Sequence, residues 1–70
     1  MNRRFDDSDL QTLANICEAA ANRFHENAVT LRQMKMTDLA SQFEQQEKEA
    51  RDLSSLFMNA EPFEVTYESA

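Results

Sequence analysis

Residues 10–31 read LQTLANICEAAANRFHENAVTL, and the spacing of apolar side chains in this stretch decides the fold. The apolar residues recur at helical spacing, as one face of an amphipathic helix requires. The stripe consists of Leu10, Leu13, Ala14, Cys17, Ala20, Ala21, Phe24, Ala28 and Leu31. Four members of the stripe recur every seven residues, which suits near-antiparallel packing in a bundle. These are Leu10, Cys17, Phe24 and Leu31. The stretch therefore predicts a helix over residues 8–34.

A second apolar stripe begins after the pattern loses phase near residues 34–38. It contains Leu39, Phe43, Ala50, Leu53 and Phe57, with Leu56 at its margin. The opposite face of the same segment carries Glu44, Lys48, Arg51 and Asp52. This pattern predicts a second helix over residues 38–58. The expected N-caps are Ser8 or Asp9 for the first helix and Thr37 or Asp38 for the second.

Two helices joined by a short turn should lie antiparallel as an all-α hairpin. A lone hairpin leaves one side of each stripe in water, so we expect it to self-associate, as a dimer or larger, into a four-helix bundle. The chain has 70 residues, one cysteine and no glycine. A core of this size supplies only about 3–5 kcal/mol, and a disulfide within the chain cannot add to it. The expected interaction residues are Leu10, Leu13, Cys17, Phe24, Leu31, Phe43, Leu53 and Phe57 of the helices, and Phe63 and Tyr67 of the tail.

The two ends of the chain differ in pattern. Residues 1–7 are polar and charged. In the tail, residues 59–70, Pro62 ends the helix, and apolar residues then alternate with polar ones with a period of two. That period is typical of an extended strand. The tail is expected to pack across the bundle, to dock onto a partner or to be disordered.

Charge and composition exclude several classes of function. The net charge is −6, and the basic residues form no stripe of the kind that binds nucleic acid directly. An acidic chain favours cations or a protein with a basic surface as partner. No apolar run is long enough to span a membrane and no signal peptide is apparent, so a cytoplasmic location is expected. The sequence lacks a catalytic triad, a phosphate-binding loop and a cysteine pair, which favours a non-enzymatic protein.

Glu47 is the residue that invites a functional interpretation, because it falls between Phe43 and Ala50 near the centre of the second stripe. A carboxylate there must be paired, hydrogen-bonded, metal-bound or protonated. Glu18 and His25 are seven residues apart on one edge of the first helix, and in a hairpin that edge could face Glu47.

These residues resemble half of a ferritin-like bundle, as found in rubrerythrins and in the half-size ferritins of encapsulins. In that family a glutamate precedes an aromatic pair by six and seven positions, as Glu18 precedes Phe24 and His25 here. Glu47 matches the glutamate of the family's Glu-x-x-His metal motif, and Glu-Pro-Phe at 61–63 is similar to the segment after the second helix of the half-size ferritins. The resemblance implies Glu18 and Glu47 as ligands of iron or manganese.

The motif histidine falls at Ala50, which cannot bind metal, so the implied carboxylate site is degenerate unless His25 substitutes. We therefore expect no cofactor, and a small acidic protein that acts through self-association and protein–protein interaction. Two alternatives remain open. One is a miniature di-metal carboxylate protein that binds or oxidises iron. The other is a phage-type acidic inhibitor of a nucleic-acid-binding partner.

Overall fold

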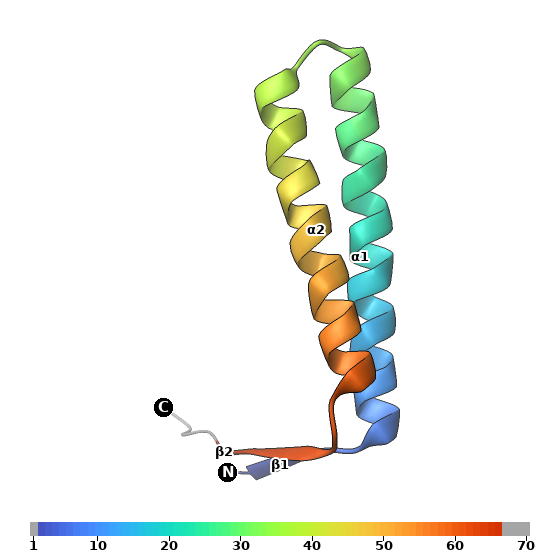
Figure 1. The fold of residues 1–70 in the computed structure, drawn as a ribbon, viewed down its shortest axis with the longest axis vertical. Coiled ribbons are helices and arrows are strands. Elements are labelled where there is room, and N and C mark those ends of the chain that lie inside the picture. The colour runs from blue at the N-terminus through green and yellow to red at the C-terminus, as the bar shows by residue number, and fades with distance from the viewer. Residues whose placement is uncertain (1, 67–70) are drawn as a thin grey trace.

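The computed structural model describes residues 2–66 and confirms the antiparallel two-helix hairpin. Helix α1 spans Asp7–Gln33 and helix α2 spans Thr37–Asn59. The helices lie side by side along their length (Figure 1). The hairpin is a single layer of helices, so each of its two broad faces is open to solvent. Assembly into a four-helix bundle remains a prediction.

Both helix starts differ from the expected N-caps. Asp6 caps α1, because its side chain accepts a hydrogen bond from the Asp9 backbone N–H while the Asp9 side chain accepts from the Asp6 N–H. The expectation of Ser8 or Asp9 as the N-cap is therefore wrong, since the extended Asp6 already forms a reciprocal capping box. Met36 occupies the N-cap position of α2 without a side-chain cap, so Thr37 and Asp38 are already helical.

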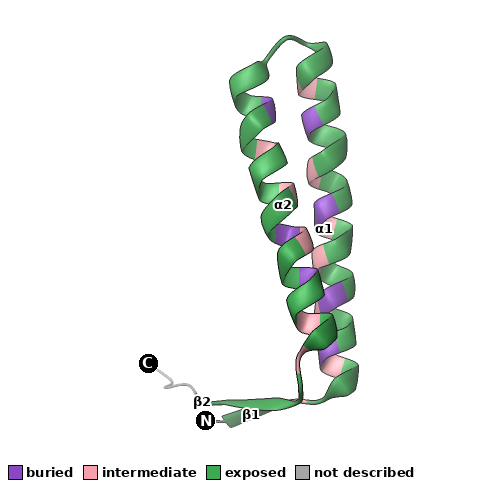
Figure 2. Cartoon of the chain, viewed as in Figure 1, coloured by how far each residue is buried: buried purple, intermediate pink, exposed green. Residues whose placement is uncertain are grey.

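The helices meet along a seam with a seven-residue repeat. On α1 the seam residues are Leu10, Ala14, Cys17, Ala21, Phe24, Ala28 and Leu31, and on α2 they are Ala40, Phe43, Glu47, Ala50, Ser54 and Phe57. All of these are buried or half-buried (Figure 2). Alternate three- and four-residue steps are the pattern of a coiled coil. Cys17 is half-buried within the seam.

Small side chains fill most of the fully buried positions of the seam. Leu10 is the one large buried side chain among the described residues; the others are Ala14, Ala21, Ala28, Ala40, Ala50 and Ser54. Small residues let two helix backbones approach closely, and the Ser54 hydroxyl donates a hydrogen bond of 3.0 Å to the carbonyl oxygen of Ala14. The hairpin is therefore closely packed but buries little large apolar surface.

The second stripe is rotated relative to the prediction. Leu39 and Leu53 were expected to face α1, yet they are 39% and 45% exposed, and Ala40 and Ser54 are buried in their place. Hydrophobicity alone assigns the larger side chains, Leu39 and Leu53, to the face of α2 that contacts α1. Because the helices lie close together, the smaller neighbours Ala40 and Ser54, one position further along the chain, occupy that face instead.

The segments that flank the two helices pair as an antiparallel ribbon beyond the helix ends (Figure 1). Strand β1, Asn2–Phe5, pairs with β2, Phe63–Thr66, with Phe5 opposite Phe63. The two rings stack with centroids 5.2 Å apart, and Arg3 lies over Phe5 and 3.6 Å from Asp9. The tail alternation thus marks a strand, whereas its partner strand in the N-terminal segment was not predicted. Tyr67 lies outside the described residues.

Candidate functional site

The seven-residue repeat places a row of side chains on each side of the seam, and the two sides differ in charge. One side, which we term the charged face, carries Glu18, His25 and Arg32 on α1, and Glu44 and Arg51 on α2, beside Glu47 of the seam. The other side, which we term the uncharged face, carries Leu13, Ala20 and Asn27 on α1, and Leu39, Gln46 and Leu53 on α2. Residues seven apart share one row of a coiled-coil helix.

Glu47 is satisfied from both helices. Its side chain is 19% exposed. One carboxylate oxygen, Oε2, accepts a 3.0 Å hydrogen bond from Arg51 Nε, and the other, Oε1, lies 3.1 Å from His25 Nδ1. The hydrogen bond from Arg51 lowers the pKa of Glu47 below its ordinary value, against a smaller rise from burial, and His25 lowers it further. The expectation that the Glu18 and His25 edge of the first helix faces Glu47 is met.

Arg51 and Arg32 bridge the two helices. The Arg51 guanidinium lies 3.7 Å from Glu18 and 3.4 Å from the Asn22 side-chain oxygen, in addition to its bond with Glu47. Arg32 donates from Nε and Nη2 to the two carboxylate oxygens of Glu44, and this hydrogen bonding lowers the pKa of Glu44. The sequence placed Glu44 and Arg51 on the outer face of α2. That interpretation is wrong, because both lie beside the seam.

The charged face carries Glu18 and Glu47, which the ferritin-like resemblance implies as ligands, and His25, which would have to substitute for the motif histidine. Arg51, however, lies between the carboxylates of Glu18 and Glu47, where the positive guanidinium offsets their charge. Ala50, at the position of the motif histidine, is buried in the seam. Residues 2–66 contain no group of three or more side chains placed to hold a metal ion. The geometry favours an ion-paired cluster that joins the helices.

We expect the charged face to make stability depend on pH. The pKa of Glu47 and Glu44 is lowered in the folded state, so their contribution is present above the ordinary carboxylate pKa. It is lost as the pH falls through the lowered folded-state pKa. The midpoint of thermal unfolding should therefore fall on acidification from about pH 5 to about pH 3. Glu47→Gln should flatten that fall, whereas Glu61→Gln, at an exposed position between α2 and β2, should not. Identical profiles for the two variants would contradict this role.

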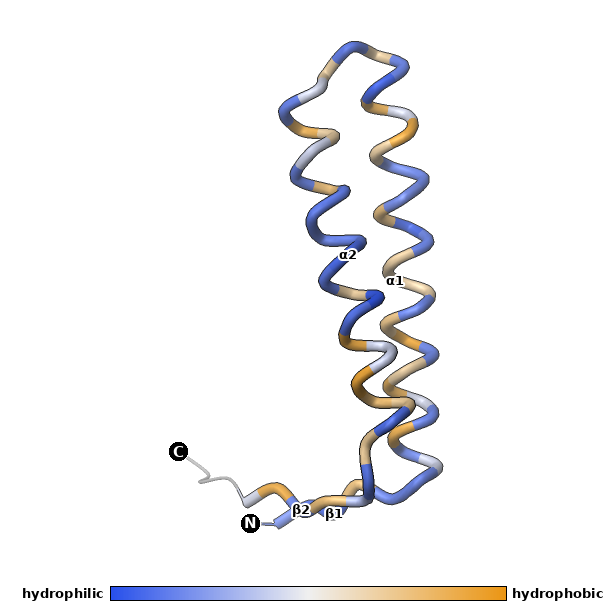
Figure 3. Tube along the Cα trace, viewed as in Figure 1, coloured by the Kyte–Doolittle hydropathy of each residue, from blue (hydrophilic) through white to orange (hydrophobic). Residues whose placement is uncertain are grey.

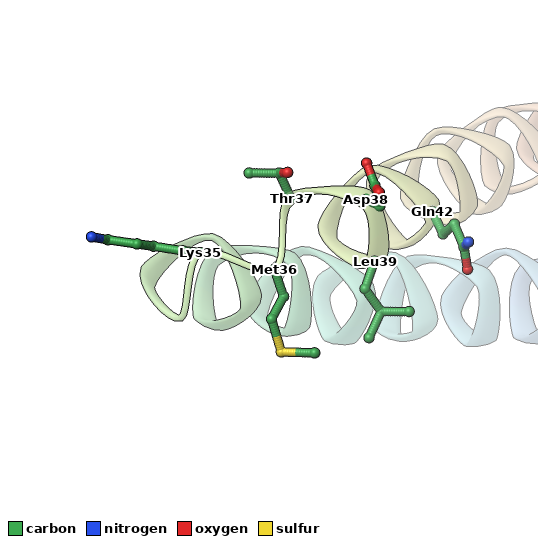
Figure 4. Close-up of a pocket in the computed structure, with 6 residues that line it drawn as sticks. All are labelled: Lys35, Met36, Thr37, Asp38, Leu39 and Gln42. Atoms are coloured by element: carbon green, nitrogen blue, oxygen red, sulfur yellow. The ribbon is translucent and has the colours of Figure 1, made fainter.

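The uncharged face is where the described residues expose leucines beside the seam. A shallow hollow at its turn end is lined by Asn27, Thr30, Leu31, Leu39 and Phe43. Around the turn, Met36 and Leu39 project to one side, and Thr37 and Asp38 project to the other (Figure 4). Along α2, strongly polar residues occupy the middle of the helix and apolar ones gather toward its C-terminal end (Figure 3). Leu53 lies near that end.

Comparison with known proteins adds no family to these observations. No protein-family model, curated protein or solved structure matches the chain. The ferritin-like resemblance therefore remains a prediction carried by Glu18, Phe24, His25 and Glu47. Neither helix in residues 2–66 has the length and apolar character needed to cross a bilayer.

Proposed function

We propose that the protein is a non-enzymatic assembly module that self-associates through its uncharged face to form a four-helix bundle. The observation that carries this proposal is the exposure of Leu39 and Leu53 beside a seam whose buried positions are mostly alanine. An all-α hairpin of this kind buries most of its large apolar side chains only when a second layer of helices covers it.

The distribution of charge indicates which face is covered. The rows on the uncharged face contain only apolar and uncharged polar side chains, and the cores of protein interfaces are depleted in charge in the same way. Covering the opposite face would remove Arg32, Glu44 and Arg51 from water. Taking charges out of water costs several kcal/mol per ion unless the pairing is excellent.

The area available is sufficient for a stable dimer. A helix of 27 residues is about 40 Å long, and two adjacent helices are about 20 Å across. One face of the hairpin therefore offers on the order of 800 Å², which matches the share of one partner in a standard protein interface. The dimer would add a second apolar layer to a core that is thin on its own.

A single charged substitution tests this surface. We expect Leu53→Lys to convert the oligomer into monomer in light scattering after size-exclusion chromatography, because it places a charge in the core of the interface. The matched control is Val29→Lys. Val29 is 44% exposed, close to the 45% of Leu53, but it lies beside His25 and Arg32 at helical spacing. A Leu53→Lys protein with the mass of the unmodified oligomer would refute the proposal.

The same preparation tests the alternative of a di-metal carboxylate protein, which the contact between His25 and Glu47 makes specific to these two side chains. Native mass spectra with added Fe(II) and Mn(II) report assembly and bound metal together. One or two metals per pair of subunits, lost in Glu47→Ala, would support that alternative. An oligomer of unchanged mass would leave the assembly module, whose acidic outer surface favours a further partner with a basic surface.

A further inference from the structure

On the basis of the proposed self-association, we propose that the partner on the uncharged face is a second copy packed antiparallel. The two-fold axis would pass beside Gln46, and the side-chain amide of Gln46 would fix the register. Neither the orientation of the dimer nor the residue that specifies it follows from self-association alone.

The α2 row of the uncharged face is symmetric about Gln46. Leu39 and Leu53 each lie seven residues away, which is about 10.5 Å along the helix. The row therefore reads leucine, glutamine, leucine in either direction. When a second α2 runs antiparallel about an axis at Gln46, Leu39 of each copy meets Leu53 of the other, and the two glutamines meet.

Gln46 is suited to that central position. Its side chain carries both a donor and an acceptor, so two copies related by the axis can exchange a pair of hydrogen bonds. In a register shifted by seven residues a leucine would cover the amide, and a buried polar group without a partner costs free energy. A single polar residue in an apolar coiled-coil interface is known to select register and oligomer state at some cost in stability.

The α1 helices are compatible with the same axis. The contact between His25 and Glu47 shows that Gln46 is level with Phe24 and His25 of α1. An axis at that level brings Arg23 of each copy within about one helical turn of Glu26 of the other copy, measured along the helix axis. Arg23 lies one turn from Ala20 and from Asn27, at the rim of the uncharged face. The rim charges are thus complementary between identical copies.

Single cysteines distinguish the orientations. Leu39→Cys, Gln46→Cys and Leu53→Cys are each made in a Cys17→Ala background and oxidised, since all three positions are exposed in the hairpin. We expect Gln46→Cys to cross-link with itself, and Leu39→Cys to cross-link efficiently only when mixed with Leu53→Cys. Efficient self-cross-linking at all three positions would instead show that the two α2 helices run parallel, and it would overturn the proposal.

The outcomes distinguish the orientation of the dimer from self-association itself. A monomer in light scattering would overturn both, whereas a dimer that does not cross-link through residue 46 would overturn the orientation alone. The role of Gln46 is tested by adding Gln46→Leu to the Leu39→Cys protein, with Gln45→Leu on the outer side of α2 as the control. We expect at least a fivefold gain in self-cross-linking for Gln46→Leu only. No gain would show that another residue fixes the register.

Discussion

Leu10→Ala is expected to leave the protein largely unfolded at 25 °C. Leu10 is 3% exposed and is the one large buried side chain among residues 2–66. Replacing a buried leucine with alanine costs about 2–5 kcal/mol, because the apolar contact is lost and a cavity remains. A core of this size supplies only about 3–5 kcal/mol. The loss is therefore comparable with the whole free energy of unfolding, and far-ultraviolet circular dichroism during urea titration should show it.

The control for this substitution is Leu56→Ala. Leu56 is 62% exposed on α2, outside the seam and beside Leu53, and in the hairpin the same change there should alter the free energy of unfolding by no more than about 0.5 kcal/mol. Both titrations must use the same protein concentration, because an oligomer gains stability by mass action. Equal urea midpoints for the two variants would show that the Leu10 end of the seam contributes little.

The first helix could be predicted closely because its apolar residues repeat every seven positions over almost its whole length. Leu10, Cys17, Phe24 and Leu31 all lie in the seam, as the repeat predicts. The phase of the second helix could not be predicted in the same way. Its leucines compete with neighbouring small residues for the seam, and only the close approach of the two backbones decides between them.

The ribbon and the full set of contacts on the charged face could not be predicted from the sequence, because both are formed by parts of the chain that are far apart in sequence. The alternation in residues 63–66 predicts an extended segment, but its partner, Asn-Arg-Arg-Phe at 2–5, carries no strand pattern of its own. Similarly, the spacing of Glu18 and His25 predicts that they face Glu47. It does not reveal that Arg51 reaches across the seam to both carboxylates.

Ala21→Leu is the complementary test of the seam, because it adds volume where Leu10→Ala removes it. Ala21 is fully buried at the middle of α1, where the close approach of the helices leaves no room for a larger side chain. Overpacking of a closely packed core typically costs about 1–3 kcal/mol. Here it should also separate Arg51 from Glu18 across the seam. We expect a lower midpoint of thermal unfolding, whereas Ala19→Leu, two residues away on the exposed side of α1, should leave it nearly unchanged. A higher midpoint for Ala21→Leu would contradict this expectation, because the helices would then have to lie far enough apart to accept a leucine. In that case the alanines would not determine the separation of the helices.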